Sequence, residues 1–157
     1  MFYQEPLPPI NPPETVWNSH RLGWLGLATF EGFGSRTLQK LAKEFEDRDA
    51  VLMAGSSDNE FCKLAWRREH KDLRGLNHWQ FADTTGSLVD QLGVREKSAG
   101  VALRATFIVD PDNTIQHVTV NNLNVGRSPQ ETLRILDGLQ TDELCPCNRE
   151  IGGQTLK

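Results

Sequence analysis

Sulfur offers the most reactive chemistry in this chain, and its three cysteines fall into two groups. Cys62 stands alone, whereas Cys145 and Cys147 are separated by a single proline. Two thiols this close in sequence could form a strained, labile disulfide or exchange with another protein. They could equally be unreactive residues in a flexible tail. A low, odd number of cysteines is not a disulfide framework, so we expect free thiols in a reducing cytoplasm.

Cys62 is a second candidate nucleophile, placed in a stretch with helical spacing of apolar residues. Phe61, Leu64 and Ala65 would share one face of a helix beginning near Asp58. On that pattern the Cys62 thiol is expected to be buried or half-buried and unreactive. The histidines show no ligand spacing relative to the cysteines, so we predict no metal site and no cofactor.

Composition excludes several classes of function. The 157 residues suit one domain, with 38% hydrophobic and 24% charged residues. A net charge of -4 gives no reason to expect nucleic acid binding. No apolar run approaches the roughly 18 residues that a membrane span needs. The first residues lack the basic start and apolar stretch of a secretory signal.

Alternating strand and helix patterns predict a three-layer α/β domain. The stretch 17–33 contains several glycines and is at best a poor strand followed by a glycine-rich turn. Ser128, Pro129 and Glu131 form the pattern of a capping box at the start of a helix. Strands are expected at 50–54, 79–82, 104–110 and 115–121, with a tight turn at 111–113. Helices are expected from 35, from 58, at 87–92 and at 128–139.

We divide the chain into three parts. Residues 1–16 hold five prolines and form an extended arm. Residues 17–142 form the domain, and residues 143–157 form a tail that contains Cys-Pro-Cys. The arm could dock on a partner protein, or lie loosely or on its own domain.

Seven stretches of the sequence together carry a family resemblance. They are Glu-Phe-Glu-Asp-Arg-Asp-Ala at 44–50, Ser-Asp-Asn-Glu-Phe at 57–61, Leu-Ala-Trp at 64–66, the stretch 88–94, Leu-Arg-Ala-Thr-Phe-Ile-Val-Asp-Pro at 103–111, the stretch 118–128 and Glu-Leu-Cys-Pro at 143–146. These stretches resemble typical 2-Cys peroxiredoxins, and particularly the actinobacterial form of the alkyl hydroperoxide reductase C branch. The match runs in order over about residues 37–150 and implies a thioredoxin-like fold of peroxiredoxin type.

The resemblance assigns roles to three residues. Arg104 corresponds to an arginine that helps to hold the peroxidatic thiolate in such enzymes, and Arg127 corresponds to a second arginine near that site. Cys145 corresponds to the resolving cysteine, which attacks a sulfenic acid on a neighbouring subunit. The tryptophan expected shortly after that cysteine is missing, since Cys147 and Asn148 follow Pro146.

The peroxidatic cysteine itself is missing at the place where the resemblance puts it. Thr29 and Phe30 could be what remains of the family's Thr-Phe-Val-Cys-Pro motif. Alignment on Trp24 and Thr29 puts Gly32 at the nucleophile's place, whereas alignment on Glu44 puts Glu31 there. Neither residue can reduce a peroxide, because the reaction needs a thiolate that becomes sulfenic acid.

Glu31 carries a further hypothesis. If it takes the nucleophile's place, its carboxylate could lie against Arg104 and Arg127, as the sulfinate of an over-oxidised cysteine would. Such a contact would favour the folded form of the active-site helix and hence ring assembly. The alternative is a solvated glutamate in a glycine-rich turn.

Two functions compete at this point. The first is a peroxiredoxin-like structural or regulatory subunit of a larger assembly, without peroxidase activity. The second is a thiol-dependent peroxidase or thiol–disulfide oxidoreductase that uses Cys145, Cys147 or Cys62. A decayed copy without a specific role is a third interpretation. The strand at Ile115–Asn121 is expected to pair with its twin in a homodimer, as in the family, and a ring or a hetero-complex could build on it.

Overall fold

The computed structural model describes residues 25–29, 42–71, 73–75 and 78–156. The proline-rich arm, the glycine-rich turn and the start of the helix expected from residue 35 lie outside them. The boundary between arm and domain therefore stays a prediction.

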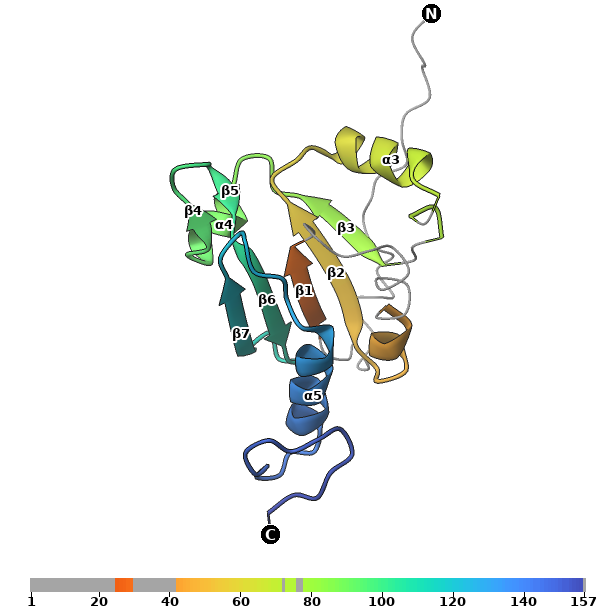
Figure 1. The fold of residues 1–157 in the computed structure, drawn as a ribbon, viewed down its shortest axis with the longest axis vertical. Coiled ribbons are helices and arrows are strands. Elements are labelled where there is room, and N and C mark those ends of the chain that lie inside the picture. The colour runs from red at the N-terminus through yellow and green to blue at the C-terminus, as the bar shows by residue number, and fades with distance from the viewer. Residues whose placement is uncertain (1–24, 30–41, 72, 76–77, 157) are drawn as a thin grey trace, which may run out of the picture.

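The described core is a five-stranded mixed sheet with the order β3-β2-β1-β6-β7 (Figure 1). Its central strand runs parallel to β2 on one side and antiparallel to β6 on the other. The strands are β1 (Leu25–Thr29), β2 (Val51–Ser56), β3 (Trp79–Ala82), β6 (Arg104–Val109) and β7 (Ile115–Asn121).

The central position of β1 differs from the poor strand that its glycines predict. Gly26 lies opposite Leu52 of β2 and Ile108 of β6. Because β1 pairs along both edges, neighbours on both sides satisfy its backbone, and this outweighs the weak strand propensity of glycine.

Three helices and a small hairpin complete the described fold. The helices are α3 (Glu60–Glu69), α4 (Ser87–Gln91) and α5 (Pro129–Gln140), and residues 42–46 are also helical. The hairpin of β4 (Arg95–Glu96) and β5 (Val101–Ala102) is absent from the sequence-based prediction, because two-residue strands are too short to show a period. The Arg95 side chain holds it by donating to Asp90, to Gly86 O at 2.9 Å and to Gly100 O at 3.0 Å.

One face of the sheet is covered by α5. Leu133 and Leu136 are 2% and 1% exposed and pack with Phe45, Leu52 and Ile108. Burying one such leucine is worth about 1.5–3 kcal/mol, so this cluster contributes strongly to stability. Leu139 packs against the same cluster, as the spacing of the three leucines predicts.

Only half of the predicted capping box forms at the start of α5. The Ser128 hydroxyl accepts from the Glu131 amide at 3.3 Å, and Pro129 occupies the first turn. The Glu131 carboxylate, however, pairs with Arg134 at 2.7 Å. A guanidinium one turn away is the stronger partner, because both groups are charged.

The opposite face carries α4, whose Val89 packs with Val94, Ala105 and Phe107. Helices on both faces give the three layers that the sequence predicts. In contrast, α3 has no buried residue, and Phe61 is 60% exposed. The apolar face predicted for this helix is therefore wrong. None of the helices in the described ranges is long and apolar enough to cross a membrane.

Candidate functional site

Thr29 and Arg104 lie at the same end of the sheet. In the antiparallel pairing of β1 with β6, Ala28 lies opposite Thr106. Thr29 ends β1 just after Ala28, and Arg104 begins β6 two positions before Thr106, so both lie beyond this pair at the same end of the sheet. Two residues that are 75 positions apart in sequence thus lie at one end of the sheet.

The loop after β7 brings Arg127 back toward this end. Asn121 is the strand partner of Arg104, and its side-chain amide donates to Gly126 O at 2.8 Å. Arg127 follows Gly126 directly and is half-buried. Arg104 is also half-buried, and in the part of the chain that the structure describes its Nε is buried without a hydrogen-bond acceptor. The two arginines are thus held in partly enclosed surroundings that suit an anion.

The residues expected at the nucleophile's place fall outside the described ranges. Glu31 and Gly32 both lie in the stretch 30–41, so the choice between the two alignments stays open. Their assignment, and the contact proposed for Glu31, remain predictions.

Cys145 lies at the other end of α5 from Arg127. The helix starts two residues after Arg127 and spans 12 residues, which corresponds to about 18 Å. The Cys145 Sγ lies 3.8 Å from Gly138 O and 3.7 Å from the Thr141 hydroxyl, both at the C-terminal end of the helix. Within one chain, the resolving-type cysteine is therefore separated from the arginines.

The segment that carries Cys145 and Cys147 is anchored, which differs from the flexible tail expected from sequence. Arg149, 7% exposed, donates to Asp137 of α5 at 2.6 Å and to Gly153 O at 2.9 Å. Leu144 pairs with Leu156 in an isolated bridge. Cys145 is half-buried and Cys147 is exposed.

Asp137 is the acidic partner in this anchor. Burial by itself would raise the pKa of Asp137. Two partners outweigh that effect and lower the pKa below its usual 3.8. The Gly152 amide donates a hydrogen bond at 3.0 Å, and Arg149 contributes both a hydrogen bond and its positive charge. The ionised carboxylate is thus the form that holds the C-terminal segment.

Cys62 is exposed on α3, which corrects the expectation of a buried or half-buried thiol. Its amide donates to Asn59 Oδ1 at 2.8 Å, the N-cap bond of the helix. The stripe of α3 that faces β3 consists instead of Glu60, Lys63, Leu64 and Arg67. Because that stripe is mostly charged, the helical spacing of apolar residues predicts the wrong face of α3 as the one that packs against the sheet.

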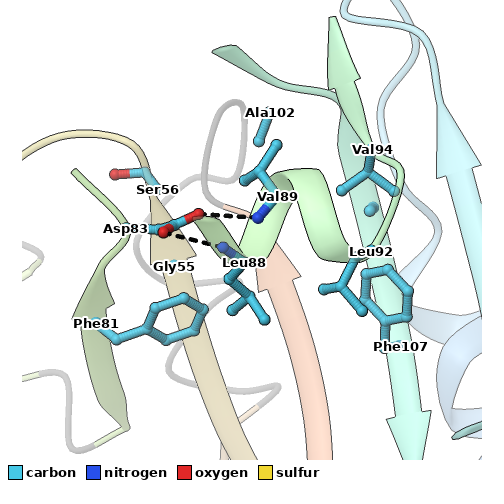
Figure 2. A pocket seen from close by; sticks show the side chains of 11 residues that line it. Gly55, Ser56, Phe81, Asp83, Leu88, Val89, Leu92, Val94, Ala102 and Phe107 are labelled. Atoms are coloured by element: carbon cyan, nitrogen blue, oxygen red, sulfur yellow. Dashed lines mark hydrogen bonds between the residues drawn. The ribbon is translucent and has the colours of Figure 1, made fainter. Parts of the chain in front are cut away.

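Sequence reasoning also missed a buried carboxylate beside α4. Asp83 is 7% exposed and accepts from the amides of Leu88 at 3.2 Å and Val89 at 2.9 Å (Figure 2). The N-cap of this helix is Gly86, which has no side chain to offer, so Asp83 takes over the capping role. An aspartate just before a helix whose N-cap is glycine is the signal that could have revealed it.

The cavity next to Asp83 is too small to be a substrate site. It lies among Phe81, Leu88, Leu92 and Phe107 (Figure 2), and its volume is about 30 Å³. A single water needs about 10–15 Å³ measured in this way, and ligand pockets are usually ten times larger. The Phe81 ring lies against Gly55, where any Cβ would overlap it.

Comparisons with known proteins agree with this architecture. Residues 35–118 match the model of the AhpC/TSA family, so the match begins after the segment with Glu31 and Gly32. The alkyl hydroperoxide reductase C of Mycolicibacterium smegmatis is 48% identical over 117 residues, covering 74% of this chain and 60% of that protein. Peroxiredoxin TSA1 of Saccharomyces cerevisiae is 41% identical over 123 residues, covering 74% and 63%. The chain thus spans about 60% of the length of the curated relatives it matches.

Solved structures are similar over a larger share. The AhpC structure of Mycobacterium tuberculosis has a TM-score of 0.73 and 40% identity, covering 83% of this chain and 77% of the other. The reduced 2-Cys peroxiredoxin of Plasmodium vivax has a TM-score of 0.76 and 28% identity, covering 86% and 77%. The thioredoxin-like fold of peroxiredoxin type is therefore confirmed, and the chain belongs to the AhpC/TSA family of peroxiredoxins.

Proposed function

We propose that this chain is a peroxiredoxin-type subunit that acts by assembly and does not itself reduce peroxides. One observation carries the proposal: the two arginines stay at one end of the sheet while the thiols lie elsewhere. Cys62 is exposed on α3, and Cys145 and Cys147 follow the far end of α5. Residues 1–61 of the sequence contain no cysteine.

The chemistry explains why the position of the thiol decides the activity. A thiolate attacks one peroxide oxygen, the O–O bond breaks, and the thiolate becomes sulfenic acid while an alkoxide or hydroxide leaves. Arginines such as Arg104 and Arg127 can stabilise the thiolate and the departing anion. They supply no electron pair, so without a thiol beside them the retained scaffold has no reductant.

The edge strand β7 supports assembly as the remaining role. It has one neighbour in the described sheet, β6, and its other edge is not paired there. Val118 and Val120 are 47% and 44% exposed, and Ile115 is 45% exposed. A long edge strand with exposed apolar residues favours pairing with another strand. We propose a homodimer through Ile115–Asn121, on which a ring or a hetero-complex could build.

Peroxide consumption tests the proposal directly. The full chain is mixed with hydrogen peroxide or an alkyl hydroperoxide and dithiothreitol, beside a variant with Cys62, Cys145 and Cys147 all replaced by Ser. We expect both proteins to consume peroxide at the same slow rate. Turnover by the wild type that the triple variant loses would overturn the proposal. Proteins that copurify with the chain, identified by mass spectrometry, would name the host complex.

The alternative, thiol–disulfide exchange, is favoured by the exposure of Cys147. Its thiolate could attack a partner disulfide, forming a mixed disulfide and releasing one partner thiol. Cys145 would then attack the Cys147 sulfur, giving a Cys145–Cys147 disulfide and releasing the second partner thiol. With Cys145→Ser the mixed disulfide would accumulate, and mass spectrometry of the non-reduced protein would detect it. Its absence would leave only the assembly role.

A further inference from the structure

A second cavity lies between α3 and the edge strand β3. One wall is the helix stripe Glu60, Lys63, Leu64 and Arg67, whose spacing places it on one face. The other wall is formed by residues of the stretch 78–82, which contains β3. The volume is about 270 Å³, against about 30 Å³ for the cavity beneath α4. The lining residues are Glu60, Lys63, Leu64, Arg67, His78, Trp79, Gln80 and Ala82.

Lys63 contributes fixed positive charge to one wall. Its ammonium donates to Ser56 Oγ at 2.6 Å and to Asp58 O at 2.7 Å, and it lies 3.4 Å from Ser56 O. An ammonium has three N–H groups, so these bonds use its donor capacity. Lys63 therefore acts on a ligand through its charge and its methylene stem.

Arg67 is placed to bind a ligand directly. It lies one helical turn after Lys63, is half-buried, and lines the same cavity. A guanidinium carries five N–H groups in a planar fork that matches the two oxygens of a carboxylate, so it can serve several acceptors at once.

His78 adds a buried neutral group beside this cation. It is 6% exposed, and burial, together with the charge of Arg67, lowers its pKa to about 4. The imidazole is thus uncharged at neutral pH. The charged groups that line the cavity are then Lys63, Arg67 and the exposed Glu60.

Apart from Gln80, the rest of the lining is apolar. Leu64, Trp79 and Ala82 are not fully exposed and lie along the same cavity as Arg67. Apolar walls with a few convergent polar groups are typical of small-molecule sites, whereas a bare inorganic anion would gain little from them.

We propose that the cavity between α3 and β3 binds a small organic anion, a carboxylate with an apolar body. Arg67 would hold the carboxylate, and Leu64 and Trp79 would contact the body. The site shares no residue with Arg104, Arg127 or the cysteines, so it does not depend on the function proposed above.

NMR titration of the isotope-labelled full chain with sodium benzoate tests this site. We expect saturable shifts of the Arg67 side-chain Nε–H signal, the Trp79 indole N–H signal and the Leu64 amide signal. Benzyl alcohol keeps the ring without the charge, and inorganic phosphate keeps a charge without the ring. Each is expected to bind at least about 5-fold more weakly than benzoate.

Two arginines of α3 provide a matched pair of variants. Arg67→Gln removes the fork from the cavity, and we expect the benzoate dissociation constant to rise about 10-fold. Arg68→Gln removes the same charge from an exposed position and should leave it unchanged. Ala82→Leu narrows the cavity without altering charge and should also weaken binding.

Several results would overturn the proposal. They are no saturable shift with benzoate, equal weakening by Arg67→Gln and Arg68→Gln, or benzyl alcohol or phosphate binding as tightly as benzoate. If Arg67→Gln fails to fold, Ala82→Leu decides the question, and unchanged benzoate affinity in that variant rejects the site.

Discussion

The two edge strands of the sheet are protected in different ways. β7 has seven residues, three of them exposed and apolar, and its outer edge pairs with nothing in the described structure. β3 has only four residues, all half-buried, and α3 lies beside it with a mostly charged stripe. A short edge with charges nearby resists strand pairing, whereas a long apolar edge favours it. This difference is the basis on which we propose assembly at the β7 edge and ligand binding beside β3.

The helices α5 and α3 also differ in how much they bury. α5 buries Leu133 and Leu136 completely, whereas α3 buries no residue. The charges of α5 pair within the molecule, since Glu131 bonds Arg134 and Asp137 bonds Arg149. On α3 the charges of Lys63 and Arg67 line a cavity. The helix α5 is therefore held by packing, whereas α3 places charged groups around a cavity beside β3.

Shortening one leucine on each helix gives the largest contrast. Leu136→Ala removes a fully buried side chain and should lower the free energy of unfolding by about 2–5 kcal/mol. Leu64→Ala removes a half-buried one and should cost about 1 kcal/mol. Urea denaturation at pH 7 measures both. Equal costs would mean that α3 contributes as much packing as α5.

A charge on β7 should separate assembly from folding. Val118→Glu places like charges close together in a strand-paired dimer, and we expect the dissociation constant to rise about 100-fold. Val125→Glu makes the same change at a residue that is 54% exposed beyond the strand, and should have little effect. Sedimentation velocity measures the mass, and circular dichroism checks the fold. A dimer that Val118→Glu leaves intact would place the interface elsewhere.

Each edge also carries a histidine, and the pH dependence of stability should distinguish them. The pKa of His78 falls from 6.5 to about 4 through burial and the charge of Arg67. Burial also lowers the pKa of His117 on β7, but this residue is only half-buried, and its imidazole contacts the Thr119 hydroxyl at 2.6 Å.

A lowered histidine pKa means that the unfolded chain binds the proton more readily. The contribution of the neutral His78 side chain to the free energy of unfolding is fully present above pH 6.5 and is lost as the pH falls toward 4. The free energy of unfolding falls between pH 7 and pH 4.5, and in His78→Gln this fall should be smaller than in the wild type by about 2 kcal/mol. His117→Gln should reduce the fall by less. Urea denaturation at the two pH values gives both differences, and a larger effect at His117 would contradict the assignment.

The parts that the sequence predicts well are those whose pattern is local. The strand at 79–82 and the start of α5 at Ser128 follow from residue types over four to twelve positions. The tight turn predicted at 111–113 also forms before β7. The Asp110 carboxylate accepts hydrogen bonds there from the amides of Asp112 and Thr114. In such segments local propensity and tertiary structure agree.

The parts that it misses depend on distant partners. β1 is a central strand because β2 and β6 flank it, and Gly26 gives no local sign of this. Arg149 is buried because it reaches Asp137, twelve positions away. At the candidate site, the juxtaposition of Thr29 with Arg104 came from the family resemblance, since neither residue carries a spacing signal. To predict the exposure of Cys62 and the cavity beside α3, the orientation of α3 must be known, and the apolar periodicity assigned that orientation wrongly.

The anchor of the C-terminal segment gives the smallest and most local prediction. Asp137→Asn removes the carboxylate to which Arg149 and the Gly152 amide donate hydrogen bonds. The segment with Cys145 should therefore open more often. A cost of about 1 kcal/mol corresponds to roughly 5-fold faster alkylation of Cys145 at pH 8. Asp142→Asn is the matched control, because Asp142 is exposed and its positive φ of 53° suits asparagine.

Acid should have the same effect as that substitution. Since the pKa of Asp137 lies below 3.8, its contribution is present above that value and is lost as the pH falls through the lowered pKa. Hydrogen exchange in residues 143–156 should therefore rise in the wild type as the pH falls below 3.8, relative to the rate expected for an unfolded chain. In Asp137→Asn it should be raised at every pH. Cys147, already exposed, should be alkylated at the same rate in both proteins. If Cys147 accelerates as much as Cys145, the variant has changed the whole fold, and the anchor is not the local contact between Asp137 and Arg149.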